Sequence, residues 1–168
     1  MALALIPVVV AAAPPNARVF VAERTGVAPW SWTGLTGDAA GLCGYEIVGR
    51  TDETAGVAST VGLRINADAT AVYGDSTGFP KTGIAAQFNG GFETVLTTIV
   101  IPIAKSGTRR LITARYSRAD GVPEVFADVI TAWSFEPTGA IARLDLDYTA
   151  GGPVTTASWK LYALMDVP

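Results

Sequence analysis

The stretch "AIARLDLDYT" (140–149) alternates between apolar and polar side chains over its second half. The apolar side chains there are those of Leu144, Leu146 and Tyr148, and the carboxylates between them are those of Asp145 and Asp147. Successive side chains of a β-strand point to opposite faces of the sheet. The stretch therefore predicts a strand with one face against an apolar core and the other face in water.

Segments of similar character recur along the chain and are separated by turns rich in Gly, Pro, Asn and Ser. They cover residues 17–23, 43–50, 60–66, 70–74, 84–88, 92–105, 109–118, 124–135 and 156–164. Short strands at regular spacing with turns between them are typical of all-β domains. We predict an all-β fold, a β-sandwich or jelly roll of about 8–10 antiparallel strands, with a barrel as the alternative. We expect residues 17–168 to form this single domain.

Two further details follow from the turn chemistry. Residues 75–83, "DSTGFPKTG", are predicted to form a loop. Pro102 lies in the longest predicted strand, and because proline has no amide hydrogen to donate, that end should be an edge or a bulge. The sequence allows at most a short helix, around residues 35–42.

The composition is unusually poor in charge. Hydrophobic residues make up 49% of the 168 residues and charged residues only 16%, against about 25% in an ordinary soluble domain. Part of the outside is then either buried against neighbours or covered with Thr, Ser, Gly and Ala. The net charge is −3 and the basic residues are dispersed, so the chain lacks the electrostatic footprint of a nucleic-acid-binding protein.

Residue types that most enzymes use are missing. The chain has no histidine, which excludes Ser-His-Asp and Cys-His catalysis and the HExxH zinc motif. Cys43 is its single cysteine, so no intrachain disulfide can form, and we expect this side chain to pack as a small hydrophobe. The glycine-rich runs have neither the P-loop lysine nor the dinucleotide fingerprint. We predict a non-enzymatic protein without a cofactor.

Oxygen-bearing side chains offer two candidate sites, each with a structural alternative. Asp145 and Asp147 would lie about 6–7 Å apart on one strand face, a spacing compatible with acid–base catalysis. A row of charged side chains on the solvent-exposed face of the strand explains the same pattern, and we prefer this interpretation. Asn66, Asp68 and Asp75 could hold calcium, but Asn and Asp also favour turns for local backbone reasons. We therefore predict no catalytic and no metal-binding residues.

Four tryptophans are candidates for the core or for a binding surface. In "PWSWTG", Trp30 and Trp32 share one face if the segment is extended, and paired aromatic side chains can form core, a subunit interface or a glycan platform. These three alternatives stay open. Because of the interface alternative, Trp30 and Trp32 are included among the predicted partner-binding residues. Trp133 and Trp159 are predicted to lie in the core.

The segment "MALALIPVVVAAAPP" (1–15) is apolar apart from its prolines. A signal peptide begins with basic residues, whereas the first basic residue here is Arg18, and Pro7 interrupts the apolar helix that a signal would form. The run is also shorter than the roughly 20 residues of a membrane span. We predict an extended arm over residues 1–16, with an integral first strand or a signal as alternatives. Its partner-binding side chains are Leu3, Leu5, Ile6, Val8, Val9 and Val10.

Three motifs in order resemble parts of the β-sandwich or jelly-roll modules of tailed-phage virion proteins. They are "GYEIVGR" near residue 45, "VGLRINADATAVYG" (61–74) and "TASWKLYAL" (156–164). The resemblance covers residues 43–164. It implies a structural protein that is usually oligomeric, often a homotrimer, located in the virion and bound to copies of itself and to the major capsid protein or another virion protein. It implies neither nucleic acid nor membrane as a partner.

The chain has no coiled-coil heptads and no collagen-like tract, which favours a capsid decoration (cement) protein or short spike over a long fibre. The decoration protein is the leading hypothesis, binding the outer capsid surface and stabilising the head. The alternative is a tail-fibre, spike or receptor-binding module that recognises carbohydrate. A glycan hydrolase or lyase and an exported adhesin domain are further rivals.

Overall fold

A computed structural model describes most of the domain that follows the N-terminal segment. The described residues are 17–52, 59–68, 73–75, 78–81, 84–88, 92–102, 110–120, 126–135, 139–150 and 156–166. The predicted arm, including its candidate residues Leu3, Leu5, Ile6, Val8, Val9 and Val10, lies outside this part of the chain.

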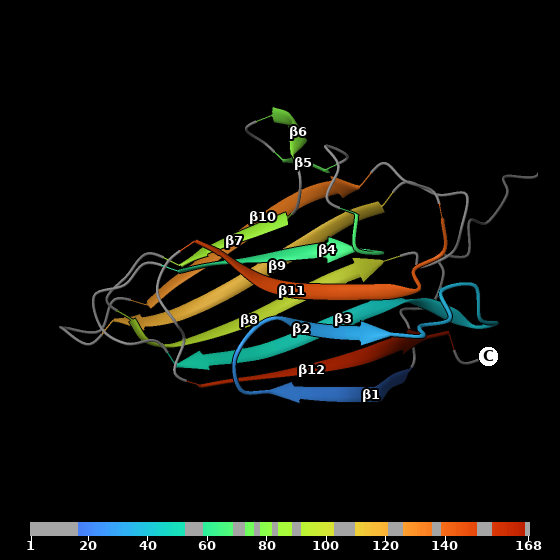
Figure 1. The fold of residues 1–168 in the computed structure, drawn as a ribbon, viewed down its shortest axis with the longest axis horizontal. Coiled ribbons are helices and arrows are strands. Elements are labelled where there is room, and N and C mark those ends of the chain that lie inside the picture. The colour runs from blue at the N-terminus through green and yellow to red at the C-terminus, as the bar shows by residue number, and fades with distance from the viewer. Residues whose placement is uncertain are drawn as a thin grey trace, which may run out of the picture.

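The described residues form an all-β fold of two antiparallel sheets and contain no helix (Figure 1). One sheet has eight strands in the order β1-β12-β3-β8-β9-β10-β5-β6, and the other has four in the order β2-β11-β4-β7. The strand bounds in chain order are β1 Ala17–Thr25, β2 Trp30–Thr33, β3 Leu42–Asp52, β4 Ser59–Ile65, β5 Tyr73–Asp75, β6 Gly78–Lys81, β7 Ile84–Phe88, β8 Phe92–Pro102, β9 Arg110–Asp120, β10 Phe126–Phe135, β11 Arg143–Ala150 and β12 Thr156–Met165.

The chain passes repeatedly from one sheet to the other. Strands β1 to β4 alternate between the sheets, β7 and β8 do so again, and β11 and β12 complete the series. The hairpins β5–β6 and β9–β10 extend the far side of the eight-stranded sheet. Figure 1 shows the four-stranded sheet lying over the larger one, from β2 at β3 to β4 and β7 at β9 and β10.

The apolar faces of both sheets contribute to one core. Its members in the small sheet include Trp30, Trp32, Leu63, Ile65, Leu144 and Leu146, and those in the large sheet include Tyr45, Ile47, Ile99, Ile101, Ile112, Trp159 and Leu161. Trp30 and Trp159 link the two sets, with ring centroids 5.8 Å apart. Many of the core strands pair with partners that are distant in sequence, such as β12 with β3 and β11 with β2 and β4, so the core depends largely on long-range contacts.

Trp159 finds its space in the core because a glycine lies opposite it. Trp159 of β12 pairs in register with Gly49 of β3. A β-carbon added at Gly49 would come within 1.9 Å of a Trp159 ring carbon. The indole therefore packs directly on the glycine backbone and is fully buried.

The tyrosine of the "LRINADATAVYG" motif closes the turn after β4. The hydroxyl of Tyr73 accepts a hydrogen bond from the Ile65 amide (2.9 Å) and donates one to the Asp68 carbonyl (3.2 Å). Asn66 and Ala67 both adopt the left-handed conformation, with φ of 56° and 57°. Burial is the main cause that raises the pKa of Tyr73, to about 12. This hydroxyl thus stays neutral and holds the turn.

Asn66, a candidate calcium ligand in the sequence, uses its side chain for hydrogen bonds to the backbone. Its side-chain oxygen accepts hydrogen bonds from the amides of Ala142 and Arg143 (2.8 and 3.1 Å), and its side-chain nitrogen donates to the Ala140 carbonyl (2.9 Å). The side chain thereby ties the turn after β4 to the start of β11.

Most predicted strands are present, and three details differ from expectation. Gly78–Lys81, inside the predicted loop 75–83, forms β6 because it pairs with β5. Residues 35–42 make turns before β3 begins, with Gly34 and Gly41 at positive φ, so the helix allowed there does not form. Trp30–Thr33 is an additional strand. Pro102 pairs with Gly44 on β3, beyond the last pair of β8 with β9 at Val100, as an edge position requires.

Candidate interaction surface

Strand β1 is the edge of the eight-stranded sheet, and its exposed residues include three consecutive apolar ones between Arg18 and Glu23. It pairs with β12, and its other side has no neighbouring strand among the described residues. Val19, Phe20 and Val21 are 48%, 54% and 41% exposed. We call these three consecutive residues the β1 edge. Natural proteins often protect such edges with charge, a bulge or cover. β1 has a bulge at Val21, yet its three apolar side chains remain exposed to water, so this edge is a candidate contact surface.

The polar side chains near the β1 edge are engaged within the chain. The Arg18 guanidinium lies 3.7 Å from the ring centre of Tyr162 and forms an ion pair of 2.5 Å with Glu46. Ser158 donates a hydrogen bond to the Glu23 carboxylate (2.6 Å). Because these polar groups interact with one another, the surface of the β1 edge that is available for contact is mainly apolar.

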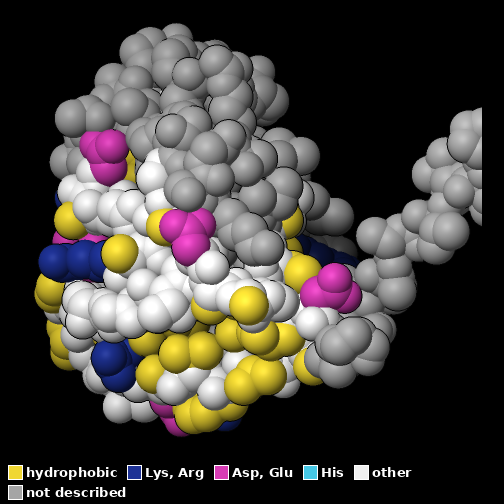
Figure 2. All heavy atoms as spheres, turned by 90° about the vertical axis from the view of Figure 1, so that its right-hand side faces the viewer, with side chains coloured by type: hydrophobic (Ala, Val, Ile, Leu, Met, Phe, Trp, Pro, Cys, Tyr) yellow, Lys and Arg dark blue, Asp and Glu magenta, His cyan; other side chains and the backbone are white. Residues whose placement is uncertain are grey.

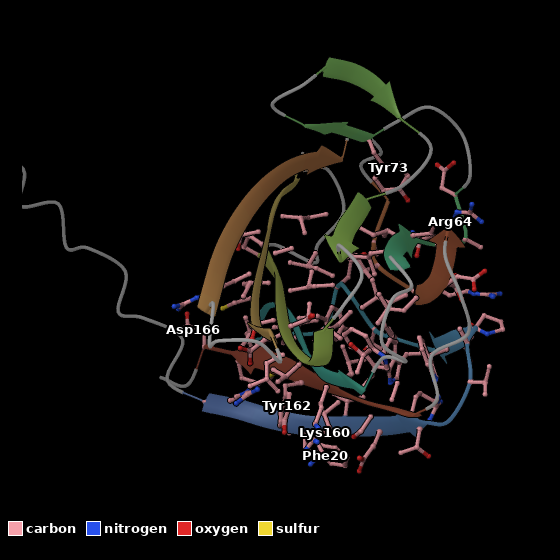
Figure 3. The ribbon with its side chains drawn as sticks, turned by 90° about the vertical axis from the view of Figure 1, so that its left-hand side faces the viewer. Phe20, Arg64, Tyr73, Lys160, Tyr162 and Asp166 are labelled. Carbon is pink, nitrogen blue, oxygen red and sulfur yellow. The ribbon has the colours of Figure 1, made fainter. Side chains whose placement is uncertain are left out.

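Phe20 extends the surface onto the outer face of the sheet. Its ring meets the ring of Tyr162 edge-on, with centroids 5.8 Å apart. Figure 3 shows Phe20, Lys160 and Tyr162 together beside β1. Since the guanidinium of Arg18 already covers one face of the Tyr162 ring, this cluster is a poor stacking platform for a sugar and is better suited to packing against protein.

An apolar hollow adjoins the β1 edge at the end of the molecule seen in Figure 2, where hydrophobic side chains gather in the lower part of the view. Its volume is about 250 Å³, and it lies between β1, β12 and the turns before β3. Its side-chain walls are formed by Val21, Leu35, Thr36, Ala39, Leu42, Tyr45, Ala163 and Met165. The Asp166 amide donates to the Gly41 carbonyl (2.7 Å) and fixes the turns against the end of β12.

The wall of the apolar hollow carries one ionisable side chain, that of Tyr45. Burial raises its pKa above the ordinary value, and a hydrogen bond with the Thr36 backbone partly offsets this effect. The hollow is therefore uncharged at neutral pH, and it suits aliphatic groups better than polar ligands.

The outer face of the four-stranded sheet has a second, polar hollow of about 180 Å³. Pro29, Ser31, Gly62, Arg64, Ala67, Arg143, Asp145 and Asp147 line it. The Asp145 carboxylate accepts hydrogen bonds from the Ser31 hydroxyl (2.5 Å) and from Nε of Arg143 (2.8 and 2.9 Å). Because these hydrogen bonds already engage the Asp145 carboxylate, the pattern fits the predicted row of solvent-facing charges better than an acid–base pair.

The other predicted site residues are placed as follows. Trp30 and Trp32 are on one face of β2 and only 2% and 1% exposed. Their burial supports the core alternative, because neither indole reaches the surface of the chain to meet a partner or a glycan. Trp159 is in the core as predicted. Cys43 is half-buried, and its thiol approaches the Gly41 carbonyl at 3.8 Å. The described residues contain no group of three metal-ligating side chains.

The β1 edge was missed by sequence reasoning although a signal was present. In "ARVFVAE" the residues Val19, Phe20 and Val21 are consecutive, so both faces of the strand are apolar at this point. A strand with one face in water should place a polar residue in the middle. This break in the alternation is the sequence signal that indicates an exposed apolar surface at residues 19–21.

Comparison with known proteins adds no assignment. Neither a protein-family model nor a curated protein sequence matches the chain. Within the described residues, no helix is long and apolar enough to cross a membrane.

Proposed function

We propose that this protein is a structural component of a tailed-phage virion, and specifically a decoration protein that binds the outer capsid surface and stabilises the head. The observation that carries the proposal is the β1 edge, with three exposed apolar residues beside an apolar hollow. This surface begins at Val19, shortly after the predicted arm 1–16, with Asn16 and Arg18 as the polar residues between the two apolar stretches. Exposed apolar surface of this kind gains free energy when a partner covers it.

We further propose that the fold is a jelly roll with an extended N-terminal arm. A jelly roll has two antiparallel sheets and two Greek keys. The pairing orders β1-β12-β3-β8 and β2-β11-β4-β7 agree with that arrangement, with the hairpins β5–β6 and β9–β10 as additions to the first sheet. Jelly rolls occur in viral capsid domains and in lectins, so this architecture is compatible with the proposed function without being specific to it.

The low charge of the chain fits a protein that acts in many copies. Each apolar square ångström removed from water contributes roughly 25 cal/mol. A subunit that contacts both a capsid protein and copies of itself, in a homotrimer for example, can bury its apolar outside on several sides. The head would be stabilised because each copy bridges neighbouring capsid subunits.

Binding to heads tests the proposal. Purified protein is mixed with expanded, undecorated heads of the parent phage and sedimented, and we expect it to pellet with the heads in many copies per particle. A chain lacking residues 2–13 is the matched variant, and it should stay folded by circular dichroism while remaining in the supernatant. A full-length protein that stays monomeric and does not pellet would contradict the proposal.

A receptor-binding module of the tail is the second candidate function, and the polar hollow favours it. Trp30 and Trp32 cannot be its stacking platform because they are buried. The hollow instead combines two guanidinium groups with two carboxylates, Asp145 and Asp147, and such donors and acceptors suit the hydroxyls of a neutral sugar. Glycan-array binding that is lost in Asp147→Ala, with sedimentation on heads absent, would support this candidate over the first.

A further inference from the structure

We infer that the apolar hollow beside the β1 edge is the docking site for residues 2–10 of a second copy of this chain. The inference rests on the proposed function in one respect, since it takes residues 1–16 to be an extended arm. It goes beyond that function by naming the partner, the segment that docks and the place where it docks.

The chemistry of the hollow matches the segment. Its walls are predominantly aliphatic, from Val21 on β1 to Leu35 and Ala39 in the turns before β3. A cavity of about 150 Å³ accommodates one benzene molecule, so 250 Å³ has room for about two aliphatic side chains. The segment 2–10 consists of aliphatic residues and one proline, and it brings no charge that burial would penalise.

The strand edge beside the hollow matches the backbone of the segment. Among the described residues no strand pairs with the second side of β1, and an extended peptide can add itself to such an edge as a strand. Val8–Val10 is β-branched and suits a strand, whereas Pro7 has no amide hydrogen and ends the pairing. In a strand, Val8 and Val10 point to the same side, which delivers two side chains to the hollow.

The start of β1 and the sequence before it favour a second copy over the chain's own segment. Ala17 pairs with Met165, which lines the hollow, so the segment joins the domain at the rim. To enter its own hollow the chain would have to reverse direction within a few residues. Pro14 and Pro15 resist this because they favour an extended conformation. Extended, 15 residues reach roughly 50 Å, which is far enough to cross to a neighbour.

Disulfide trapping between two full-length preparations tests the inference. Both carry Cys43→Ser; one also carries Val10→Cys and the other Ala39→Cys. After mixing and mild oxidation, we expect a crosslinked dimer on a non-reducing gel. The matched control replaces Ala39→Cys by Asp147→Cys, an exposed position on the opposite sheet, and should give about tenfold less crosslink. Equal yields with both partners would overturn the docking site.

The same two substitutions on one chain distinguish a second copy from self-docking. We expect the doubly substituted protein to form intermolecular crosslinks under conditions where it self-associates. An intrachain disulfide that forms at every protein concentration, without a crosslinked dimer, would overturn the assignment to a second copy.

A substitution that fills the hollow provides an independent measurement. Ala39→Phe places a ring in the space that the segment would occupy, and it should weaken self-association at least about tenfold. The control is Ala40→Phe, since Ala40 is exposed and does not line the hollow. Thermal unfolding confirms that both variants fold, and if Ala39→Phe does not, the trapping experiment still decides. Unchanged association in a folded Ala39→Phe variant would overturn the inference.

Failure of this inference can be told apart from failure of the proposed function. A protein that pellets with heads yet gives no specific crosslink keeps the decoration function and loses the docking site. A protein that crosslinks as expected but never binds heads keeps the docking site and loses the decoration function.

Discussion

Strands β1 and β12 are neighbours in the same sheet, yet they differ in which of their side chains are exposed to solvent. In β12, Trp159 and Leu161 point into the core and are fully buried, while Lys160 between them is exposed. In β1, the consecutive residues of the β1 edge are all exposed, although all are apolar. A strand of the first kind is complete within one chain. In the proposed assembly, a strand of the second kind is stabilised further when another surface covers it.

This contrast separates two kinds of substitution. Changes beside β12 should lower the free energy of unfolding of the single chain, whereas changes in the β1 edge should leave it nearly unchanged and alter association.

Gly49→Ala should have the largest effect. The new β-carbon would lie 1.9 Å from a Trp159 ring carbon, so the ring or the β3 backbone must move, and overpacking of this severity costs about 3 kcal/mol or more. The urea midpoint of unfolding measures this loss. The control is Lys160→Ala at the exposed position next to Trp159, which should change stability by less than about 0.5 kcal/mol. Equal midpoints for both variants would show that Trp159 is not confined as the register indicates.

Tyr73→Phe should cost about 1–3 kcal/mol at neutral pH, because the buried Ile65 amide loses its acceptor. It should also change the response to alkaline pH. The Tyr73 pKa is about 12 in the folded chain and 10.0 in the unfolded reference. Stabilisation by the neutral hydroxyl is therefore complete below pH 10 and lost as the pH rises through 12.

The wild type should thus lose roughly 2 kcal/mol more than Tyr73→Phe between pH 10 and pH 12. Urea unfolding of both proteins at a series of pH values measures the difference. Parallel pH curves would mean that the Tyr73 hydroxyl is not held in its neutral form by the folded structure.

Arg18→Ala tests the polar surroundings of the β1 edge and should cost at most about 1 kcal/mol. The Arg18 side chain is about half exposed, its ion pair with Glu46 is screened by water, and its contact with Tyr162 is at the surface. Adding salt should reduce the difference from the wild type. A loss of several kcal/mol in denaturant unfolding would show that the Arg18 side chain is important for the stability of the single chain, and would argue against the difference proposed between β1 and β12.

Val21→Thr should have the smallest effect on stability, within about 0.5 kcal/mol, because threonine keeps the shape and strand propensity of valine at a partly exposed position. Self-association measured by sedimentation velocity should nevertheless decrease. Thr113→Ser, a half-buried change on the distant strand β9, should leave association unchanged. If Val21→Thr destabilises the monomer but does not affect association, β1 stabilises the single chain as β12 does, and the proposed difference between the two strands is wrong.

Parts of the fold could be predicted because they depend on local geometry. The alternation at 140–149 placed Leu144 and Leu146 in the core and Asp145 and Asp147 on the outside, as the structure has them. The segment 84–88 has the same bounds as β7. Period-two patterning is fixed by the pleat of a single strand, so it can be read without knowing the partner.

What the tertiary structure decided depends on which strands pair. Trp30 and Trp32 were ambiguous in sequence, and pairing of β2 with β11 sets Trp32 opposite Leu144 in the core. Gly49 needed to be glycine because Trp159 lies opposite it. Gly78–Lys81 became a strand because β5 provides its hydrogen bonds.

The sequence by itself determined that this is an all-β protein, poor in charge and without the residues for histidine-based catalysis. The tertiary structure alone decided that β1 is an edge with an apolar hollow next to it, and that Phe20 remains exposed while both tryptophans of β2 are buried. The physical reason is that alternation along a strand follows from local backbone geometry, whereas exposure depends on neighbours that come from distant parts of the chain.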